Sequence, residues 1–165
     1  MHTLRGAIDE MRVAIEALAP EDSDFRTAFG NFRFRWDQRL RDAGLAPTWD
    51  VDLPDQVLAL PPERALQLLR VAQEALTNVL KHARASQVHV SLRLQGGELA
   101  LRVADDGRGA AGANPGGRGL ANMRTRATRL GGTLAVDFGA EGAVVALTLP
   151  AGAPPAAAGA ATIGA

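Results

Sequence analysis

Three side chains that could do chemistry recur at one-turn spacing near the middle of the chain. Glu74, Asn78 and His82 stand at positions i, i+4 and i+8, so a helix would place a carboxylate, an amide and an imidazole in one row. The apolar arc roughly opposite consists of Leu66, Leu69, Leu76, Val79, Leu80 and Ala83. We expect a helix that begins near Pro62 and ends near Ala83. The polar row favours a ligand-binding face, although on its own it also fits an ordinary solvated surface.

A glycine-rich stretch from Asp106 to Gly119 is the second chemical feature. Such a stretch suits a mobile loop, and it leads directly into a helix whose first N–H groups could hold phosphates. Five arginines in or just after it suit a polyphosphate: Arg108, Arg118, Arg124, Arg126 and Arg129. No Gly-x-x-x-x-Gly-Lys-Ser/Thr motif is present and the loop follows a hairpin, which disfavours the P-loop and Rossmann folds.

Asp105 comes immediately before this loop, at the end of a stretch that alternates apolar and polar residues. The apolar members Leu99, Leu101 and Val103 define the buried face of a strand, and Asp105 has the same parity. Its carboxylate should therefore point toward the buried side, where an unpartnered charge is costly. We expect this carboxylate to have a binding partner.

The elements that must position these residues follow from the hydrophobic periodicity. Apolar residues alternate from Val88 to Leu94, which predicts a strand with His89 on its solvent-exposed face, and Gly96-Gly97 predicts a hairpin turn. After the loop, the apolar positions of a predicted helix are Leu120, Met123, Ala127 and Leu130, followed by the stop signal Gly131-Gly132. Residues 134–138 and 145–149 predict a closing pair of strands.

Another helix and a first strand are predicted before the central helix. The stripe Phe25, Phe29, Phe32, Trp36 and Leu40 predicts a helix capped by Asp22 or Ser23 and ending near Gly44. We interpret this aromatic stripe as packing rather than a cofactor site. Thr48 to Leu53 could form a strand. The predicted fold class is α+β, a two-layer sandwich with a mixed, mostly antiparallel sheet covered on one face by helices.

Composition excludes several classes of protein. The 165 residues suit one ordinary domain, and 18 basic against 18 acidic residues argue against an electrostatic nucleic-acid binder. The absence of cysteine excludes a disulfide framework and thiolate metal sites. There is no run of about 18 apolar residues and no signal-peptide core, so we expect a cytoplasmic location for this chain.

The two ends of the chain differ from its middle. Leu4, Ile8, Met11, Ile15 and Leu18 are spaced 4, 3, 4, 3, which is typical of a helix that packs lengthwise against a partner, although a helix folded onto its own domain would give the same pattern. The last residues are rich in Ala, Gly and Pro and are expected to form a disordered tail. The predicted organisation is a helix over 1–20, a domain over 21–150 and a tail over 151–165.

Three segments of this chain resemble known sequence boxes. Glu74-Ala-Leu-Thr-Asn78 resembles the N box, Asp105-Asp-Gly107-Arg-Gly109 the G1 box and Gly117-Arg-Gly119-Leu-Ala-Asn-Met123 the G2 box of the Bergerat-fold (GHKL) ATPases. Within that superfamily, QEALTNVLKHA and GLANMRTRATRLGG are most similar to sensor histidine kinases of the nitrate-sensor and desaturase-sensor type. Each box alone is a weak signal, but three in this order and spacing are a strong one.

The resemblance implies an ATP-binding catalytic domain that transfers the γ-phosphoryl group of Mg·ATP to a histidine on a dimerisation domain. It implies that Asn78 binds Mg²⁺ through its amide oxygen, a hard donor that suits this ion. Asp105 would accept the adenine amino hydrogen and reject guanine, which has a carbonyl there. Glu74 falls where hydrolysing members of the superfamily keep a water-polarising glutamate, and here it would help to position the acceptor imidazole.

The same boxes imply further nucleotide-binding residues and partners. Lys81 and His82 end the N box beside the phosphates, and Arg118 or Arg124 would screen phosphate charge during transfer. The remaining implied contacts are Gly107, Gly109, Gly117, Gly119, Leu120 and Met123. The implied partners are ATP, the acceptor-histidine domain and a response regulator of the helix-turn-helix type, without direct binding of nucleic acid. The whole protein would be a homodimer that could be membrane-anchored, and residues 1–20 would be the end of its dimerisation hairpin.

Two departures from the family pattern matter. The closing strand of the family usually starts with Gly-Thr, whose hydroxyl supports the adenine-binding aspartate, but this chain has Gly142-Ala143. There is also no phosphoacceptor box: His2 is followed by Thr3 rather than an acidic residue. We therefore expect no autophosphorylation of this chain by itself. Two alternatives are a stand-alone serine kinase of the anti-sigma type and a nucleotide-binding or dimerisation module without catalysis.

Overall fold

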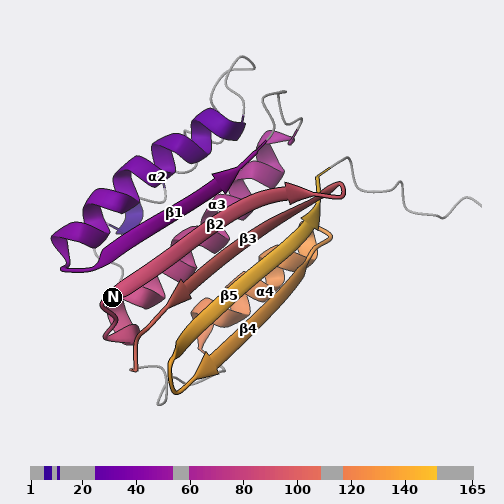
Figure 1. Cartoon of the computed structure of the whole chain (residues 1–165). Coiled ribbons are helices and arrows are strands. Elements are labelled where there is room, and N and C mark those ends of the chain that lie inside the picture. The colour runs from indigo at the N-terminus through magenta and orange to yellow at the C-terminus, as the bar shows by residue number, and fades with distance from the viewer. Residues whose placement is uncertain (1–5, 9–10, 12–24, 54–59, 109–116, 152–165) are drawn as a thin grey trace, which may run out of the picture.

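A five-stranded mixed sheet and the helices that cover it make up most of the described chain (Figure 1). The computed structural model describes residues 6–8, 11, 25–53, 60–108 and 117–151. In chain order the elements are α2 (Phe25–Asp42), β1 (Ala46–Asp52), α3 (Pro62–Asn78), the π-helical turn η1 (Val79–Ala83), β2 (Gln87–Gln95), β3 (Glu98–Asp105), α4 (Arg118–Arg129), β4 (Thr133–Gly139) and β5 (Gly142–Pro150). The α+β class and the mostly antiparallel sheet are confirmed.

The sheet has the strand order β1-β2-β3-β5-β4. Strand β1 pairs with β2 in parallel, whereas β2–β3, β3–β5 and β4–β5 are antiparallel pairs. A parallel pair needs a long crossover, which α3 and η1 provide between β1 and β2. The β2–β3 hairpin turns at Gly96 and Gly97, whose φ values of 58° and 79° are of the kind that glycine adopts readily. The second hairpin joins the first through β3 and β5.

Helices α2, α3 and α4 lie on one face of the sheet (Figure 1). The strand residues that alternate toward them are buried, as the predicted parity required: Val88, Val90, Leu92, Leu99, Leu101, Val103, Val145, Leu147 and Leu149. The opposite face carries shorter or polar side chains, including Thr48, His89 and Ala104. A helical layer over one sheet face is the two-layer architecture that the periodicity predicted.

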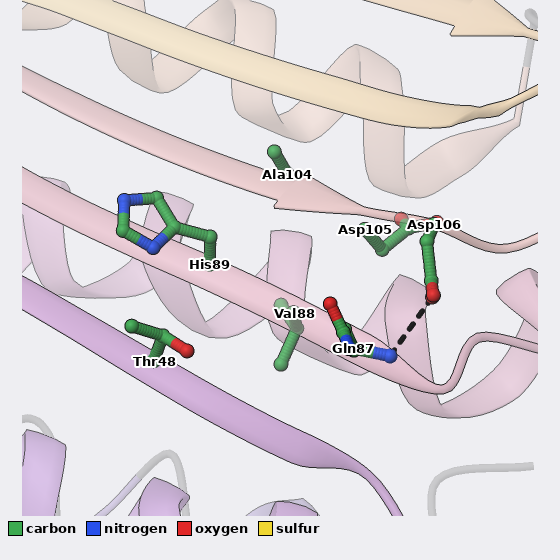
Figure 2. Close-up of a pocket in the computed structure, with 7 residues that line it drawn as sticks. All are labelled: Thr48, Gln87, Val88, His89, Ala104, Asp105 and Asp106. Atoms are coloured by element: carbon green, nitrogen blue, oxygen red, sulfur yellow. Dashed lines mark hydrogen bonds between the residues drawn. The ribbon is translucent and has the colours of Figure 1, made fainter.

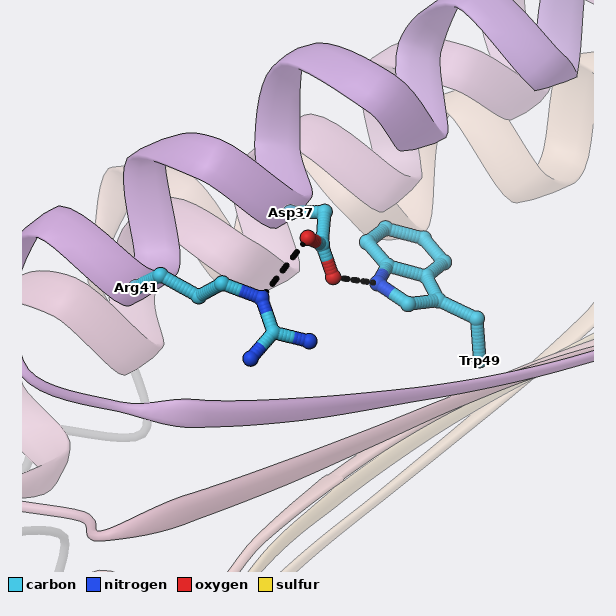
Figure 3. A network of polar contacts seen from close by, with 3 residues as sticks. All are labelled: Asp37, Arg41 and Trp49. Carbon is cyan, nitrogen blue, oxygen red and sulfur yellow. Dashed lines mark hydrogen bonds and ion pairs between the residues drawn. The ribbon is translucent and has the colours of Figure 1, made fainter.

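Helix α2 packs on β1 through its aromatic stripe, so the interpretation of that stripe as packing is confirmed. Phe29 makes an edge contact with Trp49 of β1, with ring centroids 6.4 Å apart. A polar contact fixes the same pair of elements: Asp37 accepts hydrogen bonds from Trp49 Nε1 at 3.0 Å and from Arg41 Nε at 2.8 Å (Figure 3). The predicted capping residues at 22 and 23 lie outside the described residues.

Helix α3 begins at Pro62, as predicted, but it differs from the prediction in its buried face and at its end. Leu66 and Leu80 are only half-buried, whereas Ala65, Ala72 and Ala75 are buried. The prediction gave weight to large side chains and so missed the alanines that complete the buried face. The α-helical part ends at Asn78, and the chain continues as η1 before a left-handed residue, Arg84, at φ 48°.

The beginning of α3 is tied to the end of α4 and to the end of β5. The buried Arg64 donates from Nη2 to the carbonyl oxygens of Leu130 at 3.1 Å and Pro150 at 2.8 Å. About one helical turn further along α3, Gln67 Oε1 accepts a hydrogen bond from Arg126 Nη1 at 2.8 Å. Because residues late in α4 meet residues early in α3, the two helices run antiparallel.

The described N-terminal residues are few. Residues 6–8 and 11 are helical, and Ile8 and Met11 are exposed. The other heptad positions and residues 152–165 lie outside the described residues, so the predicted helix, tail and domain boundaries stay predictions. No helix in the described part of the chain is long and apolar enough to cross a membrane.

Candidate nucleotide-binding site

The polar row of the central helix lies at the end of α3. Glu74 and Asn78 are half-buried, and Asn78 is the last α-helical residue before the chain widens into η1. π-Helical turns occur frequently at functional sites. Lys81 is exposed within η1, whereas the His82 side chain lies outside the described residues. The structure therefore places the carboxylate and the amide of the predicted row at one end of the helical layer.

Asp105 ends β3 and has the parity of the helix-covered face, as predicted. Asp105 Oδ1 accepts the Gly107 N–H at 2.8 Å. Burial raises the pKa of Asp105 above its ordinary value of 3.8, opposed by hydrogen bonds from the backbone N–H groups of Gly107 and Ala143. The partners that we expected for this carboxylate thus include backbone N–H groups. The half-buried carboxylate can also accept a hydrogen bond from a ligand.

Strand β5 begins directly against Asp105. Gly142 has φ 138°, and a Cβ at that position would overlap the Asp105 carbonyl oxygen. The glycine of the family's Gly-Thr pair is therefore required by space as well as by conformation. The next residue, Ala143, is buried and supplies its backbone N–H to the Asp105 carboxylate, so part of the support for this aspartate survives without the threonine hydroxyl.

The first turn of α4 approaches the polar row of α3. Gly117 is the N-cap of α4, and no side chain in the described part of the protein caps this helix start. A Cβ on Gly119 would overlap Glu74 Oε1, so the end of the Glu74 side chain lies directly against the first turn of α4. The α4 N-terminus, with its outward N–H groups and partial positive charge, therefore lies beside the Glu74 carboxylate.

The other predicted residues occupy different surroundings. Arg118, Arg124, Arg129 and Arg108 are exposed, whereas Arg126 is committed in part to Gln67. Leu120 and Met123 are buried in the core, Met123 completely. Gly107 is buried, Gly117 half-buried, and Gly109 lies outside the described residues. The end of α3, the end of β3 and the start of α4 lie at one end of the sheet, at the lower left of Figure 1.

Asp106 also lies in this region and was not among the predicted site residues. Its Oδ1 accepts the N–H groups of Ser86 and Gln87, each at 2.8 Å. The sequence signal was the second acid of the Asp-Asp-Gly run, but its role depends on contacts with residues about twenty positions earlier.

A shallow depression of about 250 Å³ lies beside these residues, on the sheet face opposite the helices (Figure 2). It is lined by Thr48, Gln87, Val88, His89, Ala104, Asp105 and Asp106. The prediction that His89 is exposed to solvent was wrong in degree, because its ring is half-buried along this depression.

The residues at this end can hold a metal ion only together with other ligands. The described residues contain no group of three or more His, Asp and Glu side chains suited to a metal. Asn78 offers one hard oxygen donor. Mg²⁺ usually keeps several waters and binds substrate phosphates alongside one or two protein ligands, so this donor set fits an ion that arrives with a nucleotide.

Comparison with known proteins agrees with this arrangement. Residues 63–153 match the family described as histidine kinase-, DNA gyrase B-, and HSP90-like ATPases. The chain belongs to this ATPase family. The matched residues include all three boxes together with β5, so the assignment drawn from the boxes is confirmed, while α2 and β1 precede the match.

The relatives of this ATPase domain are sensor kinases. The signal transduction histidine-protein kinase/phosphatase UhpB of Salmonella typhimurium is 33% identical over 147 residues, covering 88% of this chain and 29% of that protein. The nitrate/nitrite sensor protein NarQ of Escherichia coli is 40% identical over 90 residues, covering 53% of this chain and 16% of that protein. The chain thus spans less than a third of these relatives and corresponds to their ATP-binding catalytic domain.

A solved structure shows the same fold. The histidine kinase domain of the blue-light activated histidine kinase from Erythrobacter litoralis superposes with a TM-score of 0.65 at 24% identity, covering 89% of this chain and 77% of that chain. The two-layer ATPase fold is therefore shared even where most residues differ.

Proposed function

We propose that this ATPase domain binds Mg·ATP and transfers its γ-phosphoryl group to a histidine on a separate dimerisation domain of a sensor kinase. One observation carries the proposal: the half-buried Asp105 carboxylate lies at the same end of the sheet as Asn78 and the start of α4. These groups suit, respectively, an adenine amino group, a hydrated cation and a row of phosphates.

Each residue then has a role in phosphoryl transfer. Asp105 accepts the adenine amino hydrogen, and its acceptor oxygens leave a guanine carbonyl unpaired, so the site selects ATP over GTP. Asn78 supplies an oxygen to Mg²⁺, which neutralises phosphate charge when bound. The N–H groups at the start of α4 and the exposed Arg118 bind phosphate oxygens. Glu74 positions the acceptor imidazole by accepting a hydrogen bond from the N–H of one ring nitrogen.

The transfer needs an acceptor histidine on a separate domain, which must bind next to the nucleotide. The free ring nitrogen attacks the γ-phosphorus while the bond to the β-phosphate oxygen breaks, and ADP leaves. We propose that the acceptor domain, a response regulator and a second copy of the whole protein are its partners. The described residues supply the nucleotide side of that reaction only.

Nucleotide titration of the chain tests the proposal. ATP and ADP should bind in the presence of Mg²⁺, GTP should bind at least about tenfold more weakly, and Asp105→Asn should lose most of the affinity for ATP. No ATP or ADP binding, or full binding after Asp105→Asn, would contradict the proposal. Incubation with an acceptor-histidine domain and labelled ATP should give an acid-labile phosphoprotein; an acid-stable product would indicate a serine kinase instead.

Phosphotransfer to that acceptor domain separates catalysis from binding alone. Asn78→Asp keeps an oxygen donor but adds a charge next to the phosphates, and it should abolish transfer. Transfer that never exceeds a no-enzyme control would identify a binding module without catalysis.

A further inference from the structure

Asp106 connects the start of β2 with the end of β3. Its Oδ1 accepts the N–H groups of Ser86 and Gln87 at 2.8 Å, and its own N–H donates to the Gln87 carbonyl oxygen at 3.3 Å. Figure 2 shows the Asp106 carboxylate reaching across to Gln87. The hydrogen bond from Gln87 is the main reason that the pKa of Asp106 lies below its ordinary value, with a further contribution from Ser86.

The first of the two segments leads back to the metal-binding end of α3. Ser86 and Gln87 follow η1, which starts at the residue after Asn78. Between η1 and Ser86 the backbone passes through Arg84, which has the left-handed conformation. The two hydrogen bonds to Asp106 hold the end of this irregular connection, at Ser86 and Gln87, against the residue that follows β3.

The second segment presents the adenine-binding carboxylate. Asp106 stands between Asp105 and Gly107, and the Gly107 N–H donates to Asp105 Oδ1. Both carboxylates border the depression, but Asp106 is exposed, whereas Asp105 is half-buried and has the parity of the helix-covered face. Asp106 is therefore placed to act through its neighbour rather than on a nucleotide.

We infer that Asp106 is a positioning residue that fixes the separation between the Asp105 carboxylate and the Asn78 amide. The inference rests on the proposed function, in which these two groups hold opposite ends of one nucleotide. A ligand that must satisfy both groups at once binds tightly only when their spacing is set beforehand, because any freedom between them is lost on binding. Ligands that touch one group alone do not depend on that spacing.

The test compares a ligand that contacts both Asp105 and Asn78 with ligands that contact only one of them. The full chain and its variants are titrated with Mg·ATP, with adenosine and with Mg·tripolyphosphate. Asp106→Asn keeps an acceptor oxygen at Oδ1 without the charge, whereas Asp106→Glu keeps the charge and displaces the acceptor. We expect the affinity of Asp106→Asn for ATP to lie within about threefold of that of the unchanged chain, and the affinity of Asp106→Glu to be at least about tenfold lower. The affinities for adenosine and tripolyphosphate should be nearly unchanged in both variants.

Controls separate this inference from the proposed function and from unfolding. Asp137→Asn alters an exposed carboxylate on β4 and should bind ATP like the parent. Thermal melting confirms that each variant is folded, and faster hydrogen exchange of the Ser86 and Gln87 amides in Asp106→Glu reports loss of the connection. If the parent binds ATP and Asp106→Glu binds it equally well, or loses adenosine affinity in the same proportion, the positioning role is wrong. If the parent binds no ATP, the proposed function fails and the inference with it.

Discussion

The proposed role of the Asp105 carboxylate and its burial favour opposite protonation states. Recognition of an adenine amino group requires an ionised or at least accepting oxygen, yet burial favours the protonated form and raises the pKa of this aspartate. The backbone N–H groups of Gly107 and Ala143 offset part of that effect. In its proposed role of binding adenine, Asp105 therefore carries some cost to the stability of the free domain.

A pH dependence follows from this raised pKa. As the pH falls from neutrality through the pKa of Asp105, which lies above 3.8, the carboxylate protonates and the affinity for ATP should decrease. The free domain responds in the opposite direction, because a group with a raised pKa in the folded state contributes stability that is present at low pH and is lost as the pH rises through that pKa. Titrations of ATP over an acid pH series check this. An affinity that stays constant down to the ordinary pKa of aspartate would contradict it.

Ala143 offers a gain-of-binding experiment. Ala143→Thr should bind ATP about fivefold more tightly, because a hydroxyl beside Asp105 would add about one hydrogen bond of roughly 1 kcal/mol. Ala143→Val has nearly the same shape without the hydroxyl and is the matched control. Isothermal titration of both variants checks the prediction. Equal affinities for the threonine and valine variants would show that the hydroxyl contributes nothing here.

Residue parity was enough to predict which face Asp105 belongs to, because an alternating strand leaves little freedom. The role of Asp106 could not be predicted in the same way. Asp106 accepts hydrogen bonds from the backbone N–H groups of Ser86 and Gln87, which follow an irregular turn. Almost any residue type at those two positions would supply the same N–H groups. A hydrogen bond that a side chain accepts from distant backbone N–H groups leaves no trace in the sequence pattern of the donor residues.

The contact between α3 and α4 decides the shape of the site at the level of secondary structure. Gly119→Ala should change the free energy of unfolding by less than about 1 kcal/mol but weaken ATP binding, because the end of the flexible Glu74 side chain would have to move away from the added Cβ. The helix propensity of alanine, which by itself favours the substitution by about 1 kcal/mol, offsets the cost of that movement. Chemical denaturation and ATP titration check both effects.

Gly30→Ala is the matched control for this prediction. Gly30 lies within α2, and no atom of the described residues comes within 4 Å of the place where a Cβ would stand. Its substitution should therefore stabilise the domain by about 1 kcal/mol. In a Glu74→Ala background, Gly119→Ala should stabilise the domain by about as much as Gly30→Ala does, since the overlapping oxygen is removed. The same effect of Gly119→Ala with and without the Glu74 side chain would contradict the packing argument.

Elements were predictable to different degrees. The helices and strands after Pro62 follow from clear periodicity, and the start of α3 was predicted at the correct residue. The π-helical turn after Asn78 was not predicted, because widening a helical turn requires no particular residue type. The sequence pattern favoured a continuous helix to Ala83, whereas the α-helical part of the structure ends at Asn78.

At the scale of the whole molecule, Arg64 connects three elements far from the nucleotide site. Arg64→Met should lower the free energy of unfolding by about 2–4 kcal/mol, because the carbonyl oxygens of Leu130 and Pro150 would lose a charged donor in a buried place. Denaturant unfolding checks the loss. Arg129→Met, on the exposed side of α4, should change stability by less than about 0.5 kcal/mol. Equal effects of the two substitutions would contradict a special role for Arg64.

The order of the strands was beyond the sequence pattern. Periodicity identified two hairpins and a first strand, but it did not show that β5 rather than β4 joins β3, or that β1 adds in parallel. Those choices depend on contacts between distant segments, such as Leu101 with Leu147 in the β3–β5 pair. Likewise, the buried arginine was indistinguishable from the exposed ones in the sequence.

The Arg64 contacts also mean that the two ends of α4 are held to the rest of the domain in different ways. Side-chain hydrogen bonds made by Arg64 and Arg126 connect its C-terminal end to α3, whereas its first turn lies beside Glu74 without a side-chain cap from the described residues. We expect any tilt of α4 about its C-terminal end to displace most the first turn, where phosphates would bind. We expect the amides of residues 122–125 to exchange with solvent faster than those of 126–129, and ATP to slow the first group more than the second. Uniform exchange along α4 would mean that the helix does not pivot.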